Sequence, residues 1–160
     1  MPKFQLAYLA GPVDLISEKE SKFWRENLSS DLSKQNISSY SPPHAFTLAN
    51  SEGEKIMEIN WKAIEQCDLF ILNLTQDTLT IGGIRELQKA IDWGKYTIII
   101  IKSESMQKHI VYLSDVTAVV TSTDAVLEHV KYLELERDRG EGIDRTCVKL
   151  PETGMERSTS

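Results

Sequence analysis

Glu86 is the residue of this chain whose type and position most suggest chemistry. It lies a few residues after the pair Gly82-Gly83, in the first turns of a helix predicted over 84–93. Free backbone N–H groups and the positive end of the helix dipole favour a negative charge there, so we expect Glu86 to be ionised. Acidic residues are also common in first turns simply as caps, and spacing alone favours that interpretation.

Gly82 and Gly83 offer a second chemical possibility. Without side chains they let the backbone approach a ligand closely, and a strand followed by a glycine turn and a helix start can bind an anion. The pair matches neither the P-loop nor the dinucleotide-binding fingerprint, however, and a flexible turn would use the same residues. The anion-binding interpretation therefore stays open beside the structural one.

Asn60 interrupts an apolar stripe on the helix predicted over 54–66, where Ala63 and Ile64 lie on the same face. A buried amide must find hydrogen-bond partners or incur a desolvation cost of about 1–3 kcal/mol. Asn60 therefore either ties down a neighbouring loop or faces a polar pocket. The residue pattern does not choose between these two interpretations.

Periodic apolar residues predict the elements that must position these side chains. On the first predicted helix, Phe23, Trp24, Leu28 and Leu32 recur at helical spacing and indicate an amphipathic helix. The predicted strands span 4–10, 37–40, 69–74, 96–101 and 116–120, and the predicted helices span 17–34, 54–66, 84–93 and 122 or 123 to about 135.

This alternation of strands and helices predicts an α/β fold, a doubly wound parallel sheet with right-handed helical crossovers. Such sheets bind ligands outside the carboxyl ends of their strands, near the point where the strand order reverses. That edge would collect the segment 11–14, the loop at Pro42 and the segment 75–83. We therefore expect the chemistry at this edge.

One domain and a tail account for the 160 residues. The length suffices for one core but not for two typical domains, and we predict a domain over 1–135. The segment 136–160 has few apolar anchors and is predicted to be a flexible tail. The net charge of −6 and the absence of a long Lys/Arg run argue against a nucleic acid polymer as partner and favour small molecules.

Neither a secretory signal nor a membrane anchor is predicted. The N-terminal apolar stretch is too short for a signal peptide, and no run approaches the roughly 18 apolar residues of a membrane span. We therefore expect a soluble, cytoplasmic protein without membrane association. Cys67 and Cys147 have no metal-ligand spacing, and both are expected to be ordinary reduced cysteines.

Several short motifs follow one another in an informative order. They are YLAGP at 8–12, Trp24-Arg25, Ser41-Pro42, and the segments 60–68, 82–90 and 94–95. In this order and nearly this spacing they resemble the nucleoside 2-deoxyribosyltransferase superfamily, which includes the deoxynucleoside 5′-monophosphate N-hydrolases. The resemblance extends from about Phe4 to Ile101, and it rests on the succession of motifs rather than on any single one.

The resemblance implies a flavodoxin-like, five-stranded parallel sheet with helices on both faces. It implies a homo-oligomer whose subunits complete each other's pockets, and a nucleoside or nucleotide substrate without a cofactor or metal. Glu86 would attack the anomeric carbon of a 2-deoxyribosyl group and expel the base, with Tyr8 orienting the carboxylate and Asn60 completing the catalytic set. The substrate-binding residues implied are Ala10, Gly11, Pro12, Asp14, Thr78, Thr80, Gly82 and Gly83.

Two departures from the family pattern leave the reaction open. The family commonly carries an aspartate where this chain has Asn60, and an amide cannot donate or accept a proton as a carboxyl does. The segment 77–83 does not align uniquely, so Asp77 and Thr80 compete for one pocket position. Two hypotheses follow, an enzyme acting at the N-glycosidic bond and a non-catalytic nucleotide-binding or regulatory module on the same fold.

Overall fold

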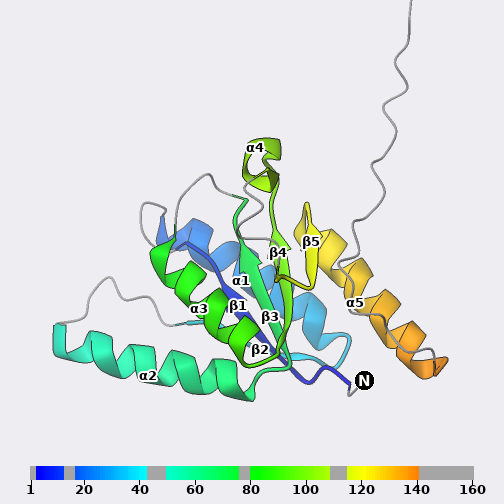
Figure 1. Ribbon diagram of the computed structural model, residues 1–160, viewed down its shortest axis with the longest axis horizontal. Coiled ribbons are helices and arrows are strands. Elements are labelled where there is room, and N and C mark those ends of the chain that lie inside the picture. Colours follow the sequence, from blue (N-terminus) through cyan, green and yellow to red (C-terminus); the bar gives the residue numbers. More distant parts are fainter. Residues whose placement is uncertain (1–2, 13–16, 43–49, 76–79, 109–114, 141–160) are drawn as a thin grey trace, which may run out of the picture.

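The computed structural model describes residues 3–12, 17–42, 50–75, 80–108 and 115–140, in which strands and helices alternate (Figure 1). The strands are β1 (Leu6–Ala10), β2 (Ser38–Tyr40), β3 (Leu69–Asn73), β4 (Tyr96–Ile100) and β5 (Ala118–Val120). The helices are α1 (Glu18–Ser33), α2 (Asn50–Gln66), α3 (Ile81–Asp92), α4 (Glu104–Gln107) and α5 (Thr123–Asp138).

The five strands form one sheet in the order β2-β1-β3-β4-β5, and every neighbouring pair is parallel. The chain adds β2 on one side of β1 and the later strands on the other side, so the order reverses between β1 and β3. The predicted doubly wound, flavodoxin-like sheet is therefore confirmed. Its switch point lies where β1 ends at Ala10 and β3 ends at Asn73.

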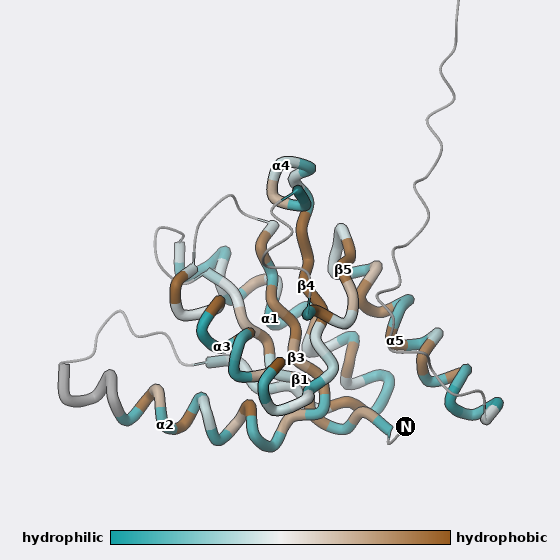
Figure 2. The backbone as a smooth tube through the Cα atoms, viewed as in Figure 1, coloured by the Kyte–Doolittle hydropathy of each residue, from teal (hydrophilic) through white to brown (hydrophobic). Residues whose placement is uncertain are grey.

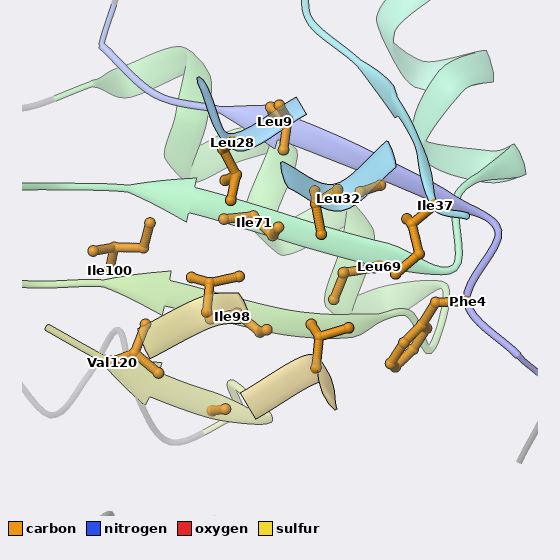
Figure 3. Packing of buried hydrophobic residues seen from close by; sticks show 14 of the residues in the cluster. Phe4, Leu9, Leu28, Leu32, Ile37, Leu69, Ile71, Ile98, Ile100 and Val120 are labelled. Atoms are coloured by element: carbon orange, nitrogen blue, oxygen red, sulfur yellow. The ribbon is translucent and has the colours of Figure 1, made fainter. Parts of the chain in front are cut away.

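Alternation along the strands sends their side chains into two separate cores. On one face Leu9 and Ile71 pack with residues of α1 and α5 (Figure 3). On the opposite face Tyr8 and Phe70 pack with residues of α2 and α3. Strands covered on both faces must be almost continuously apolar, and Figure 2 shows the hydrophobic colour along the central strands.

Helix α1 does not bury every residue that hydropathy favours. Phe23 is 64% exposed, so its predicted place on the apolar side is wrong. Residues three or four apart share a helix face, and the buried line consists of Leu32, Leu28, Arg25 and Ser21. Phe23 lies five residues before Leu28 and therefore points away from the sheet, while a charged side chain takes the inward position.

Helix bounds differ from prediction where the sequence lacks apolar periodicity. Helix α2 begins at Asn50 rather than at Glu54, α5 continues to Asp138 rather than to about Leu135, and the short α4 is not predicted. Periodicity detects an apolar stripe, and the polar segments that begin α2 and end α5 have none. Within the described ranges, no helix combines the length and apolar character needed to cross a membrane.

Candidate active site

Tyr8 lies in the middle of β1 and is fully buried under α2 and α3. Its ring stacks on Phe70 with centroids 5.3 Å apart, and it lies 5.4 Å from the ring of Tyr40. Its hydroxyl has no hydrogen-bond partner of ordinary geometry among the described residues. Burial raises the pKa of Tyr8 and the nearby carboxylate of Glu86 raises it further, so the structure brings these two predicted residues together.

Helix α3 carries Glu86 in its second turn. The helix begins at Ile81, earlier than predicted, because Thr80 caps it, and the Thr80 hydroxyl accepts a 3.0 Å hydrogen bond from the backbone N–H of Gly83. Gly82 and Gly83 consequently belong to the first helical turn rather than to a turn before the helix. Since Thr80 is the cap and the first turn contains no acidic residue, Glu86 is not a capping acid.

Burial governs the charge of Glu86. The effect of the helix dipole falls off within the first turn, and Glu86 lies beyond it. Burial raises the pKa of Glu86 from 4.5 to about 7, against the opposing effects of the Tyr8 hydroxyl and the Arg25 guanidinium. The expectation that the helix start favours the ionised form is therefore wrong, and near neutral pH both forms are populated.

Asn60 lies on α2 and is only 7% exposed. Its Oδ1 accepts a 2.9 Å hydrogen bond from the hydroxyl of Tyr40, the last residue of β2. Burial raises the pKa of Tyr40, and the charge of Glu86 adds to that effect. Asn60 is thus tied to the end of a neighbouring strand, and that strand end lies within electrostatic reach of Glu86.

Arg25 is 3% exposed and places its guanidinium at the carboxyl end of β1. Its Nη2 donates to the carbonyl of Gly11 at 3.0 Å, its Nε donates to the carbonyl of Leu9 at 3.3 Å, and its Nη1 donates to the carbonyl and hydroxyl of Ser21. Burial lowers the pKa of Arg25 to about 10, against the effect of Glu86. The guanidinium therefore keeps its positive charge at neutral pH.

The three predicted substrate-binding glycines differ in the space around them. A Cβ atom at Gly11 would lie 2.8 Å from the Trp24 ring, and one at Gly83 would lie 2.9 Å from the Thr80 side chain. Packing alone therefore excludes a side chain at these two positions. A Cβ atom at Gly82 would meet no described atom within 4 Å, so Gly82 is the glycine with open surroundings.

The remaining predicted substrate-binding residues divide into two groups. Ala10 and Pro12 are buried at the end of β1. Asp14 and Thr78 lie outside the described residues, as does Asp77. Among the residues that the structure does describe, no group of three or more His, Cys, Asp or Glu side chains is arranged to hold a metal ion.

Neither Arg25 nor Tyr40 is predicted from the sequence to have a chemical role. A signal for Arg25 was available, since it lies three residues before Leu28 and interrupts the inward line of α1 as Asn60 interrupts that of α2. Tyr40 ends its strand directly before the Ser41-Pro42 pair, which places it at the carboxyl edge. A strand of three residues is too short to indicate which face its side chains take.

Comparison with known proteins finds a match among solved structures, whereas no protein-family model and no curated protein matches. A conserved protein from Enterococcus faecalis V583 has a TM-score of 0.60 and 17% identity, covering 81% of this chain and 99% of its own. The CMP N-glycosidase BcmB of Clostridium botulinum has a TM-score of 0.51 and 19% identity, covering 81% and 98%. A 2-deoxyribosyltransferase from Bacillus psychrosaccharolyticus has a TM-score of 0.59 and 16% identity, covering 76% and 90%.

These likenesses define the class of fold to which the chain belongs. It is the flavodoxin-like α/β fold that a 2-deoxyribosyltransferase and a CMP N-glycosidase also adopt. The fold that the sequence resemblance implies is thereby confirmed. At identities of 16% to 19% the reaction of this chain must be inferred from its own residues.

Proposed function

We propose that this protein cleaves or transfers at the N-glycosidic bond of a 2′-deoxynucleoside or its 5′-monophosphate, with Glu86 as the nucleophile. The observation that carries this proposal is the convergence of Glu86, Tyr8 and the Tyr40–Asn60 pair near the switch point of the sheet. A carboxyl group whose pKa is tuned to neutrality, beside a phenol that can orient it, suits covalent glycosyl transfer. Fold neighbours with names that describe both reactions add support.

In the first step a carboxylate oxygen of Glu86 attacks C1′ of the sugar. A C–O ester bond forms, the C1′–N bond breaks, and its electron pair leaves with the base. Tyr8 would hold the other carboxylate oxygen through its hydroxyl and so fix the rotamer of the nucleophile. The base leaves as an anion and must take up a proton from solvent, because the amide of Asn60 supplies a hydrogen bond and no acidic proton.

In the second step water or another base attacks C1′ from the opposite side. The ester bond to Glu86 breaks, the carboxylate is regenerated, and the attacking water or base loses a proton to solvent. Water as the attacking group makes the protein a hydrolase, and a second base makes it a transferase. The same covalent sugar-enzyme intermediate serves both outcomes.

The test is an incubation with each deoxynucleoside and deoxynucleoside 5′-monophosphate, with and without a free base, followed by chromatography of the bases. We expect base release or exchange with at least one substrate, and a loss of about 1,000-fold or more in Glu86→Gln. Glu128→Gln, which changes an exposed glutamate on α5, is the matched control. Absence of turnover with all substrates, or turnover unaffected in Glu86→Gln, contradicts the proposal.

The covalent intermediate has a separate test. Acid quenching during turnover and intact-mass analysis should show an added deoxyribosyl group, which peptide mapping should place on Glu86. Glu86→Gln should show no such adduct under the same conditions. Turnover in the wild type without any adduct on Glu86 would replace the covalent path by direct displacement with water.

The second candidate is a non-catalytic module that binds a nucleotide on the same fold. Asn60 favours it, because this buried amide cannot protonate a leaving group and its Oδ1 is already engaged by Tyr40. Such a module predicts that nucleotides raise the melting temperature while no product forms. Base release that depends on Glu86 would exclude this candidate.

A homo-oligomer is part of the same proposal. Three large apolar residues, Ile59 on α2 and Ile81 and Trp93 at the two ends of α3, are exposed in the single chain. These two helices cover the sheet face that holds Tyr8, so a second copy on them would lie beside the site. Light scattering should then give a mass above that of one chain, and Ile81→Glu should lower it.

A further inference from the structure

The buried guanidinium of Arg25 is the feature of the site that the proposed reaction leaves unused. Four of its hydrogen bonds go to the uncharged groups of Leu9, Gly11 and Ser21. In the described part of the chain no carboxylate lies within ion-pair distance of it. A buried charge is expensive in free energy unless other charges or dipoles compensate it.

Arg25 lies at the switch point itself. The position that a Cβ atom on Gly11 would occupy is 3.4 Å from Arg25 Nη2 and 3.4 Å from the carbonyl oxygen of Asn73, the last residue of β3. The guanidinium therefore reaches from α1 to the gap between the ends of β1 and β3. Its bonds to Leu9 and Gly11 fix the backbone of β1 on both sides of Ala10.

Within the described part of the chain, the titratable groups that interact electrostatically with Glu86 are two phenols and one cation. Tyr8 comes from β1, Tyr40 from β2 and Arg25 from α1, and all three interact electrostatically with the carboxyl group. The phenols are neutral at physiological pH because burial raises both of their pKa values. Among the described residues, Arg25 is consequently the positive charge that offsets the burial of the carboxylate.

We propose that Arg25 is the positioning residue of this site, which anchors the end of β1 from α1 and holds a buried positive charge at the switch point, where it acts on Glu86. The catalytic part of this role rests on the proposed function. The electrostatic coupling between Arg25 and Glu86 can be measured without turnover. An experiment can therefore contradict the role of Arg25 and the proposed function separately.

The first test uses the wild-type protein and needs no substitution at Arg25. The Arg25 Nε–Hε signal and the Glu86 side-chain carboxyl carbon are followed by NMR from about pH 5 to about pH 9. We expect one common midpoint for the two signals, and the response of Arg25 should disappear in Glu86→Gln. The exposed Arg85, which neighbours Glu86 in sequence, is the internal control and should show a much smaller response.

The second test separates the charge of Arg25 from its hydrogen bonds. Arg25→Met removes the charge, and we expect the midpoint of Glu86 to rise by roughly half a pH unit or more, whereas Arg25→Lys should keep it near the wild-type position. Arg85→Met is the matched control and should leave the Glu86 midpoint in place. The acidic limb of the pH profile for kcat/KM should move with the same midpoint.

The outcomes distinguish a positioning residue from a purely structural one. Loss of stability in Arg25→Met without a shift of the Glu86 midpoint, or an Arg25 signal in the wild type that ignores Glu86, overturns the proposal. If Arg25→Met does not fold, the wild-type titration and the Glu86 midpoint in Arg25→Lys test the proposal instead. Coupled titrations in a protein that turns over no substrate would support the role of Arg25 and contradict the proposed function.

Discussion

At the scale of single residues, Tyr8 combines a buried hydroxyl with the lack of a regular hydrogen-bond partner among the described residues. Such a hydroxyl costs about 1–3 kcal/mol, so we expect Tyr8→Phe to leave the free energy of unfolding unchanged or to raise it by about 1 kcal/mol. Turnover at neutral pH should nevertheless fall by about 10-fold or more, because Glu86 loses the phenol that orients it and lowers its pKa. Chemical denaturation and the base-release assay measure the two effects.

Tyr40→Phe is the matched control for this substitution. The Tyr40 hydroxyl donates to Asn60 at 2.9 Å, and its removal leaves a buried amide oxygen without that donor. We expect a loss of about 1 kcal/mol in the free energy of unfolding. A Tyr8→Phe variant that loses as much stability as Tyr40→Phe would show that the Tyr8 hydroxyl is engaged in a structural hydrogen bond.

The raised pKa of Glu86 predicts how the activity depends on pH. Only the ionised carboxylate attacks carbon, and burial raises the pKa of Glu86 to about 7. The rate constant kcat/KM should therefore rise with pH through this value and level off above it. A profile that is already flat below about pH 5 would mean that Glu86 ionises as an ordinary carboxyl group does.

Local pattern identified some of these residues and missed others for a physical reason. Asn60 was identified because a polar side chain on an apolar stripe needs a partner, and Arg25 obeys the same rule on α1. The partner itself was not predictable, since Tyr40 lies on β2 and meets Asn60 only through the packing of α2 on the sheet. The pKa of Glu86 likewise depends on β1 and α1, which are remote in sequence.

At the scale of elements, the first turn of α3 contains two glycines with different surroundings, and this difference predicts opposite effects of alanine. Gly82→Ala places a methyl group in open space within a helix and should raise the free energy of unfolding by about 0.5–1 kcal/mol. Gly83→Ala pushes against Thr80 and Leu72 and disturbs the helix cap, so it should lower that free energy by about 1 kcal/mol. Urea denaturation of the two variants measures both changes.

The same pair tests whether Gly82 serves a ligand. Nothing in the described surroundings of Gly82 requires a glycine. If the backbone must approach a nucleotide closely there, Gly82→Ala should weaken nucleotide binding while it stabilises the protein. A variant that is more stable and binds as well as the wild type would leave Gly82 without a functional reason.

Comparison of the predicted and observed bounds shows which helices and strands apolar periodicity can locate. Continuous apolar runs identified β3 and β4 to within a residue. Strands covered on both faces are apolar throughout, so the ends of the apolar run mark the ends of the strand. The start of α3 was predicted too late for two reasons. Its two glycines indicate a turn, and Thr80 lacks the acidic residue three positions later that would complete a capping box. The doubly wound arrangement was predicted from general rules and from the resemblance, whereas the strand order was not predicted, since pairing is a property of the folded sheet.

At the scale of the whole molecule, two titratable groups on opposite faces of the sheet, the half-buried Glu86 and the buried His129, give opposite pH dependences of stability. Glu86 packs on the face of α2 and α3, and its pKa in the folded protein is raised from 4.5 to about 7. The folded state therefore takes up this proton first, and Glu86 contributes stability at low pH that is lost as pH rises through about 7. That shift corresponds to at most about 3–4 kcal/mol.

His129 acts in the other direction. It lies buried on α5, its Nε2 lies 2.8 Å from the Tyr96 hydroxyl in a hydrogen bond, and burial lowers its pKa below 6.5. The unfolded chain takes up this proton first, so the contribution of His129 is complete above its ordinary pKa and is lost as pH falls. Between about pH 5 and about pH 6.5 the two contributions oppose each other.

The variants Glu86→Gln and His129→Gln separate these two contributions. Each removes one titratable group and keeps a side chain that can form hydrogen bonds. On acidification from about pH 8 to about pH 5, Glu86→Gln should lose more stability than the wild type, and His129→Gln should lose less or gain some. The free energy of unfolding from urea titrations at each pH measures this, with Glu128→Gln as the control for a change in net charge alone. Variants whose curves run parallel to the wild type would mean that neither group titrates differently in the folded and unfolded states.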